Sequence, residues 1–187
     1  MSFELNLLKG TYIDFAVGTV IKGKEMQVFT EYFPLIRPAL EALKIQTLLP
    51  FIILDTNTSG PIPEQGALTQ VSSPDNFAKF HEDPRFIQAK PLRDEAMTFL
   101  NDGNFFHSRD CKLSLETDTD YAFILSSEST ANIEPIISLQ AAENSPQKRY
   151  EAKSVMLTLW SDEAEQLLAN KHTDALVFKV RFPSNQG

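Results

Sequence analysis

Charged side chains on two predicted strands are the residues of this sequence best placed for acid–base chemistry. Residues Thr11 to Val20 alternate in polarity as a strand does, so Tyr12 and Asp14 share one face. Lys179 and Arg181 share one face of a second predicted strand near the C-terminus. If these faces line a cavity, a carboxylate lies opposite two cations, either as a structural ion pair or as an acid–base and anion-binding site. The competing interpretation is that both faces are solvated at the ends of a sheet.

One histidine is a second candidate for chemistry. His81 follows Phe80 on a predicted helix and precedes the turn Asp83-Pro84-Arg85. It is either a general base near neutral pH or a surface histidine at a helix end. His81 and Asp14 are therefore the candidate catalytic residues. The predicted ligand pocket consists of six side chains: Tyr12, Asp14, Phe51, Trp160, Lys179 and Arg181.

Neither a metal site nor a cofactor site is predicted. His107 and Cys111 stand four residues apart, but zinc needs about four ligands and no second pair exists. Cys111 is the only cysteine, so no disulfide can form within the chain. Glycine-rich phosphate loops, dinucleotide-binding patterns and the usual hydrolase motifs are absent from the sequence.

Hydrophobic periodicity predicts the elements that would position these residues. Helical spacing runs from Glu25 to Leu43, where Pro34 and Pro38 predict a kink or a break. Ser73 and Ser161 are predicted to cap two further helices. Residues 92–100 fit a helix or a strand equally well. Alternating or apolar runs predict strands at Thr11–Val20, Ile45–Asp55, Glu64–Ser72, Asp120–Ser126 and Ala175–Phe182, and a hairpin from Ile133–Ala142 to Arg149–Trp160.

The arrangement of strand, serine cap and helix occurs twice along the chain. It appears in residues 66–75 and again in residues 154–163, each time after a pair of strands. The first half thus has the order β-α-β-β-α-β, which is the split pattern of the ferredoxin-like fold. In the second half no stretch clearly corresponds to the helix at Glu25–Leu43, unless Ile133–Ala142 is a short helix.

The first hundred residues resemble the dimeric α+β barrel superfamily. The best-matching stretch is Phe77-x-x-Phe80-His81-x-Asp83-Pro84-x-Phe86, followed by Pro91-Leu92-Arg93, and it resembles a helix of an uncharacterised bacterial family about one repeat long. The rest resembles a second, partly eroded copy. The resemblance implies an α+β fold of tandem ferredoxin-like repeats, residues 1–108 and 109–187, packed sheet to sheet as an α+β barrel. Ile13, Phe15 and Val17 would then pack under helices.

Composition and charge narrow the classes of function. The 187 residues are 42% hydrophobic and 22% charged, which is typical of a globular protein. The net charge of −8 argues against a protein that binds nucleic acid through contacts with its phosphates. The N-terminus lacks a signal-peptide pattern, and the longest apolar run, residues 48–54, is far short of the roughly 20 residues that cross a bilayer. We therefore expect a soluble, cytoplasmic protein without membrane or nucleic-acid partners, and homodimerisation stays open.

Two functions of different classes follow, and the sequence does not decide whether the protein is an enzyme. Members of the superfamily that it resembles include cofactor-free oxygenases of quinol-type aromatics, haem-degrading enzymes, lactone isomerases and dehydratases. The first expectation is thus a small-molecule binder, of an aromatic or quinone-like ligand between the sheets, with cofactor-free monooxygenase or isomerase activity as its catalytic form. The alternative is a non-catalytic structural or interaction module whose barrel is filled by Phe51, Met156 and Trp160.

Overall fold

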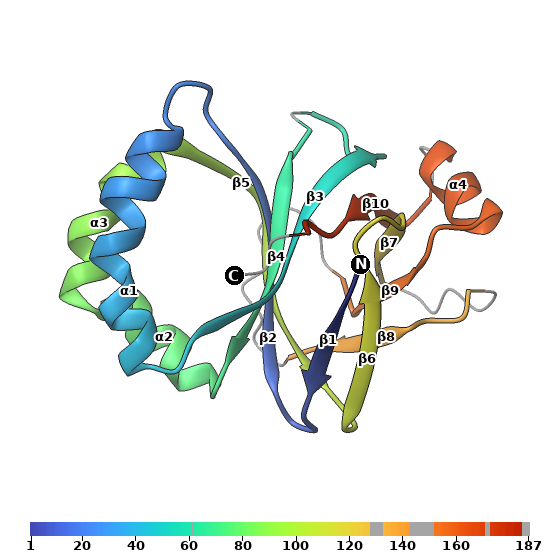
Figure 1. Cartoon of the computed structure of the whole chain (residues 1–187), viewed down its shortest axis with the longest axis horizontal. Coiled ribbons are helices and arrows are strands. Elements are labelled where there is room, and N and C mark those ends of the chain that lie inside the picture. Colours follow the sequence, from blue (N-terminus) through green and yellow to red (C-terminus); the bar gives the residue numbers. More distant parts are fainter. Residues whose placement is uncertain (61, 128–132, 143–151, 171–172, 185–187) are drawn as a thin grey trace.

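A computed structural model describes residues 1–60, 62–127, 133–142, 152–170 and 173–184, with the backbone alone at 99–102. Strands dominate, and helices lie on two sides of them (Figure 1). The helical segments are η1 (Gln27–Tyr32), α1 (Phe33–Ala42), α2 (Pro74–Glu82), α3 (Pro84–Ala96) and α4 (Asp162–Ala169). The strands are β1 (Ser2–Leu7), β2 (Tyr12–Val20), β3 (Gln46–Thr56), β4 (Gln65–Val71), β5 (Met97–His107), β6 (Cys111–Glu116), β7 (Tyr121–Ser126), β8 (Ile137–Ala141), β9 (Ser154–Leu159) and β10 (Ala175–Arg181).

Eight strands close into one antiparallel barrel in the order β10-β3-β4-β2-β5-β8-β9-β7. The strands of the N-terminal half are contiguous in this order, and so are those of the C-terminal half. The two groups meet edge to edge, because β3 pairs with β10 and β5 pairs with β8. Closure pairs every barrel strand on both sides, which removes exposed sheet edges.

The predicted fold class, tandem ferredoxin-like repeats packed sheet to sheet, is wrong. Two stacked sheets would share only a face, whereas here the edge strands hydrogen-bond into a single closed barrel around one interior. The described residues between β7 and β8 also contain no helix, so the C-terminal half is not a βαββαβ unit. The alternative of a short helix at Ile133–Ala142 is likewise wrong, since β8 lies there as a strand. The coarser expectation of an α+β barrel is confirmed.

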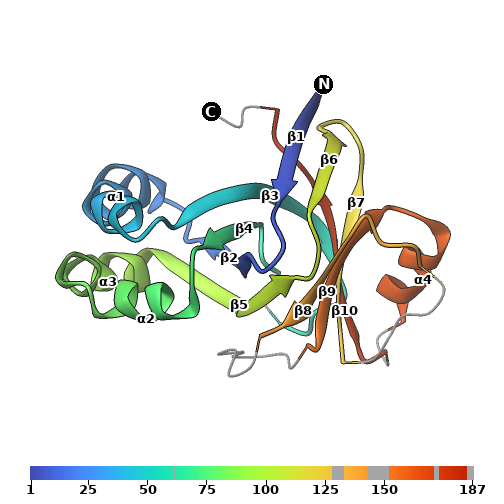
Figure 2. The same cartoon turned by 90° about the horizontal axis from the view of Figure 1, so that it is seen from below.

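Helices η1, α1, α2 and α3 form a layer over the outer face of β2, β4 and β5 (Figures 1 and 2). The predicted helix at Glu25–Leu43 stays helical through both prolines and changes from a π segment to an α-helix just before Pro34. Pro34 lacks an amide hydrogen, so the turn preceding it gives up one regular helical bond. The stretch that fitted helix and strand equally well contains both: α3 ends at Ala96 and β5 begins at Met97.

Two predicted serine caps are confirmed. Ser73 Oγ accepts a hydrogen bond from the Asn76 amide at 3.2 Å, and Ser161 Oγ accepts one from the Ala164 amide at 3.3 Å. Each bond satisfies one of the amide donors that a helix leaves unpaired at its start. These local bonds explain why α2 and α4 begin where the sequence indicated.

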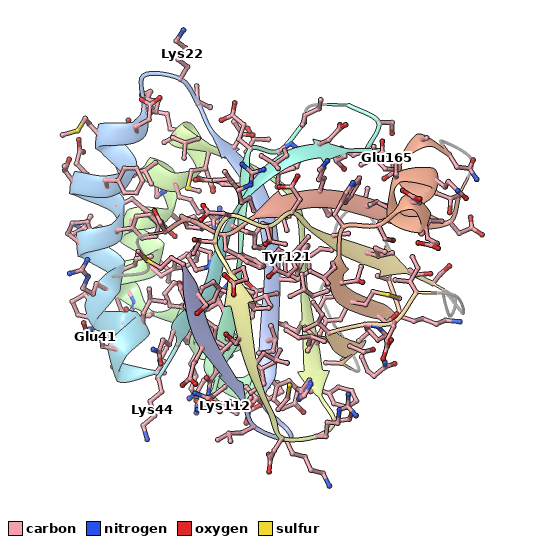
Figure 3. All side chains as sticks on the ribbon, turned by 45° about the vertical axis from the view of Figure 1, so that its right-hand side comes forward. Lys22, Glu41, Lys44, Lys112, Tyr121 and Glu165 are labelled. Carbon is pink, nitrogen blue, oxygen red and sulfur yellow. The ribbon has the colours of Figure 1, made fainter. Side chains whose placement is uncertain are left out.

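The remaining two strands, β1 and β6, form a separate antiparallel ribbon that packs against the barrel. Leu5, Leu7 and Leu115 belong to the same buried cluster as the barrel interior. Tyr121, labelled in Figure 3, lies where ribbon and barrel meet, and its hydroxyl oxygen accepts a hydrogen bond from the Glu116 amide at 2.9 Å. The ribbon therefore shares one hydrophobic core with the barrel. Among the described residues, no helix is long and apolar enough to cross a membrane.

Candidate functional site

The barrel interior, where a ligand was expected between the sheets, is packed with aromatic side chains. The ring centroid of Phe15 lies 5.8 Å from that of Phe51, 5.3 Å from that of Phe123 and 6.1 Å from that of Phe178. Phe51 and Phe123 are 4.7 Å apart, and all four side chains are at most 1% exposed. Phe51 is thus a core residue. Of the other side chains expected to fill the barrel, Met156 and Trp160 pack outside it, in the cluster around α4.

The two faces of β2 are reversed relative to the prediction. Ile13, Phe15 and Val17 point into the barrel rather than under the helices. Tyr12 packs with the helix layer, and alternation along the strand places Asp14 on that same outer face. The reason is the closure of the barrel, because its interior is sealed on all sides and takes the more apolar face of each strand.

Three other predicted site residues come together, but on the outside of the barrel. The Lys179 ammonium lies 4.4 Å from the centroid of the Trp160 ring and 3.5 Å from Asp120 Oδ2. Arg181 Nε donates to Asp120 Oδ1 at 2.9 Å. The carboxylate that pairs with both cations is therefore Asp120, and not Asp14 as the sequence suggested. Asp120, Lys179 and Arg181 thus form a half-buried ion-paired group on the outer face of the barrel.

His81 belongs to an aromatic cluster at the junction of α2 and α3. Its ring is exposed and stacks on Phe86, with centroids 5.0 Å apart, while Phe77 lies at 4.8 Å. Asp83 accepts the Arg85 amide at 2.8 Å and so caps α3. The hydrogen bond from the Arg85 guanidinium is the largest cause that lowers the pKa of Asp83, to about 2. The motif that carried the family resemblance thus builds a helix junction.

Residues 107 and 111 do not form a metal site. His107 is 2% exposed at the end of β5, and Cys111 begins β6, where it pairs with Leu7. No group of three or more histidine, cysteine, aspartate or glutamate side chains in the described ranges could hold a metal ion.

The face between the helix layer and the barrel has an unusual composition. At its two ends Tyr12 and Val20 of β2 pack against the helices, as a hydrophobic interface requires. Between them the outward positions of β2, β4 and β5 are small or polar and only half-buried. We call these side chains the interlayer face; they are Asp14, Ala16, Ala67, Thr69 and Asn104.

Strand register brings the interlayer face together. Asp14 is the direct partner of Thr69 on β4 and of Asn104 on β5, so three polar residues form one row across three strands. Ala16 is the partner of Ala67 in the next outward row. Oδ1 of Asp14 is buried although the residue as a whole is partly exposed. A carboxylate beneath a helix layer is the kind of buried polar group that calls for a function.

The helix layer contributes polar groups from its own buried side. Tyr32 lies in the row of buried residues Val28, Tyr32 and Ile36, and it is 6% exposed. Burial raises the pKa of Tyr32, and a hydrogen bond with Arg93 acts in the opposite direction. Arg93 lies between the buried residues Ala89 and Ala96 of α3. Its guanidinium carbon is 5.2 Å from the centroid of the Phe86 ring, and its Nε donates to Asp94 Oδ1 at 2.9 Å.

The outer face of the C-terminal half, under α4, is apolar, unlike the interlayer face. There Ala122, Ile124, Met156 and Val177 are buried in one cluster under α4. Among the described residues, the N-terminal face alone combines a covering helix layer with a small, polar centre. Sequence reasoning identified Asp14 but missed Thr69, Asn104, Tyr32 and Arg93. Strand register identifies Thr69 and Asn104, and contacts within the helix layer identify Tyr32 and Arg93. No sequence signal singled out any of the four.

Comparison with known proteins does not identify a family. No family model matches the chain, and no curated protein matches it. Among solved structures, the chain is similar to an anthrone oxidase-like protein, with a TM-score of 0.47 and 10% identity over 96% of this chain and 95% of that one. It is also similar to a haem-binding protein from Thermus thermophilus, with a TM-score of 0.45 and 8% identity over 96% and 93%. These likenesses are too distant to assign a ligand.

Proposed function

We propose that this protein binds a small aromatic or quinone-like molecule at the interlayer face, between the helix layer and the barrel wall. The observation that carries the proposal is the composition of that face. Its ends are closed by apolar packing, while its centre holds Asp14, Thr69 and Asn104 beside two alanines. Ligand sites combine apolar walls with a few placed polar groups in the same way.

The side chains suit a flat molecule that carries oxygen groups. Ala16 and Ala67 leave little above the strand backbone, so a ring could lie over them. The Asp14 carboxylate would accept a hydrogen bond from a ligand hydroxyl, and the Tyr32–Arg93 pair would donate to a carbonyl oxygen. If the protein is an enzyme, we propose a cofactor-free oxygenation or isomerisation, with Asp14 as the group that accepts the hydroxyl proton.

The second candidate is a non-catalytic structural or interaction module. The packed phenylalanines of the barrel favour it, because they occupy the space in which the first prediction placed the ligand. The two candidates differ in one measurable way. A module has no small-molecule affinity at the interlayer face, and substitutions there would change stability alone.

The test uses Ala16→Leu, which extends a side chain into the centre of the interlayer face. The probes are menadione, a quinone, and 1-naphthol, an aromatic hydroxyl compound. With ligand at about a hundred times its Kd, binding stabilises by about 2.7 kcal/mol, which raises the Tm of a chain of this size by about 5–10 °C. We expect Ala16→Leu to abolish this rise. The matched control is Ala42→Leu, which adds the same atoms at the exposed last position of α1 and should keep it.

A second variant tests the role assigned to the carboxylate. Asp14→Asn should weaken 1-naphthol binding about tenfold, because a hydrogen bond to a charged acceptor is worth about 1.5–3 kcal/mol. It should leave menadione, which has no hydroxyl, nearly unchanged. The proposal fails if neither probe shifts the Tm of the unmodified protein, or if Ala16→Leu binds both probes as well as Ala42→Leu does.

A further inference from the structure

A surface pocket of about 450 Å³ lies where β9 ends and α4 begins. Helix α4, which contributes Glu163 to the lining, lies on the opposite side of the barrel from the helix layer that covers the interlayer face (Figure 1). One wall is the segment of residues 133–136 that leads into β8. The other wall is formed by Thr158, Leu159 and Ser161 at the end of β9, and by Glu163 in the first turn of α4.

Both walls are held in place by hydrogen bonds. The Ile136 amide donates to the Leu157 carbonyl at 2.8 Å, and Thr158 Oγ1 donates to the Glu134 carbonyl at 3.1 Å, so the first wall is tied to β9. On the other side, the cap at Ser161 fixes the start of α4, and Trp160 Nε1 donates to Glu165 Oε2 at 3.1 Å. Figure 3 labels Glu165 on α4. A pocket with fixed walls loses little conformational entropy when it binds.

The lining combines apolar surface with negative charge. Leu159 is 53% exposed, and Ile133 and Ile136 are half-buried, so the pocket offers aliphatic surface to solvent. Among the described residues that line the pocket, Glu134 and Glu163 carry charge and none is a cation. A hydrogen bond from its own backbone amide, followed by one from Ser161, lowers the pKa of Glu163 below its ordinary value.

We propose that this pocket binds a small organic cation, an amine or quaternary ammonium group on an aliphatic or aromatic body. The two carboxylates complement the positive charge, and the isoleucine and leucine side chains cover the apolar body. The volume lies within the range of about 300–1,000 Å³ that small-molecule pockets occupy. The site is separate from the interlayer face and does not depend on the function proposed there.

The experiment compares three probes that share one body and differ in charge: 3-phenylpropylamine, 3-phenylpropan-1-ol and 3-phenylpropionate. Trp160, the only tryptophan of the chain, lies between the lining residues Leu159 and Ser161, so its fluorescence reports binding. We expect the amine to bind about fivefold more tightly than the alcohol, as two partly exposed ion pairs permit. The propionate should bind least, and added salt should reduce only the preference for the amine.

Variants separate charge from shape. Glu163→Gln should weaken amine binding about threefold and leave the alcohol unchanged. Asp162→Asn removes the same charge from the neighbouring position, which is outside the lining, and should have little effect. Leu159→Ser should weaken all three probes. Ala16→Leu should leave all three unaffected, which separates this test from the one at the interlayer face. The proposal is overturned if the alcohol or the propionate binds as tightly as the amine, or if none of the probes binds.

Discussion

Replacement of Gly66 by alanine tests the packing of the barrel interior directly. Gly66 lies on β4, opposite Val17 of β2 and Phe51 of β3. A Cβ atom at this position would come within 3.0 Å of two atoms of the Phe51 ring and 2.7 Å from the carbonyl oxygen of Ala16. Real Cβ atoms essentially never approach other atoms so closely, so Gly66→Ala must displace the ring or the backbone.

Two opposing effects set the size of the change. Alanine loses less backbone entropy than glycine on folding, which favours the variant by about 0.5–1 kcal/mol. Overpacking of a filled core costs about 1–3 kcal/mol. The upper part of that range applies here, because Phe51 already packs against Phe15 and Phe123, and β2 is paired on both sides. We therefore expect a net destabilisation of about 2 kcal/mol.

Urea unfolding of four proteins measures this effect and its cause. Phe51→Leu alone should destabilise by about 1–2 kcal/mol through the space it leaves. In the Phe51→Leu background, Gly66→Ala should cost about 1 kcal/mol less than in the unmodified protein, since the ring is gone but the Ala16 oxygen remains. Additive costs would contradict the contact between ring and glycine. A Gly66→Ala protein as stable as the unmodified one would refute the packing argument altogether.

Three further substitutions test individual contacts. Asp83→Asn should be less stable than the unmodified protein above pH 3.8, the ordinary pKa of an aspartate. Because the pKa of Asp83 in the folded protein is lowered to about 2, the difference in stability should disappear as the pH falls through about 2. A difference that does not change with pH would contradict this role of the carboxylate. Ser161→Ala should cost about 1 kcal/mol in urea unfolding through loss of the α4 cap, while Ser161→Gly should cost only a few tenths. Asp120→Asn should lower the free energy of unfolding by about 0.5–1 kcal/mol, because Lys179 and Arg181 lose a partly exposed ionic partner. The loss is measured as a decrease in Tm, and it should become smaller in high salt. A decrease in Tm that does not depend on salt would argue against an ionic role.

Most element positions could be predicted from local pattern, because the physics that produces them is local. Alternation located β2, β4, β7 and β10, and the predicted caps Ser73 and Ser161 located the starts of α2 and α4. The ribbon of β1 and β6 was missed, since its pairing joins residues more than a hundred positions apart. Residues 143–148, which connect the two strands of the predicted hairpin, lie outside the described residues.

The candidate site shows where such prediction ends. Alternation divides β2 into two faces but does not say which one is buried more deeply, so Tyr12 and Asp14 were assigned to a cavity between sheets. The pairing of Asp14 with Thr69 and Asn104 depends on strand register across three strands. The partner of Lys179 and Arg181 could not be predicted either, because Asp120 reaches them only when β7 pairs with β10. The division at residue 108 and homodimerisation stay predictions.

The sequence by itself determined helices α1, α2 and α4, most of the strands and their amphipathic character, because side-chain periodicity and capping act within a few residues; it did not determine α3. Only the tertiary structure decided that the sheets close edge to edge, that phenylalanines fill the interior, and that the face with Asp14 lies beneath the helices. Closure gains its stability from hydrogen bonds and apolar contacts between residues far apart in the chain, and no local pattern records which distant edge a strand will meet.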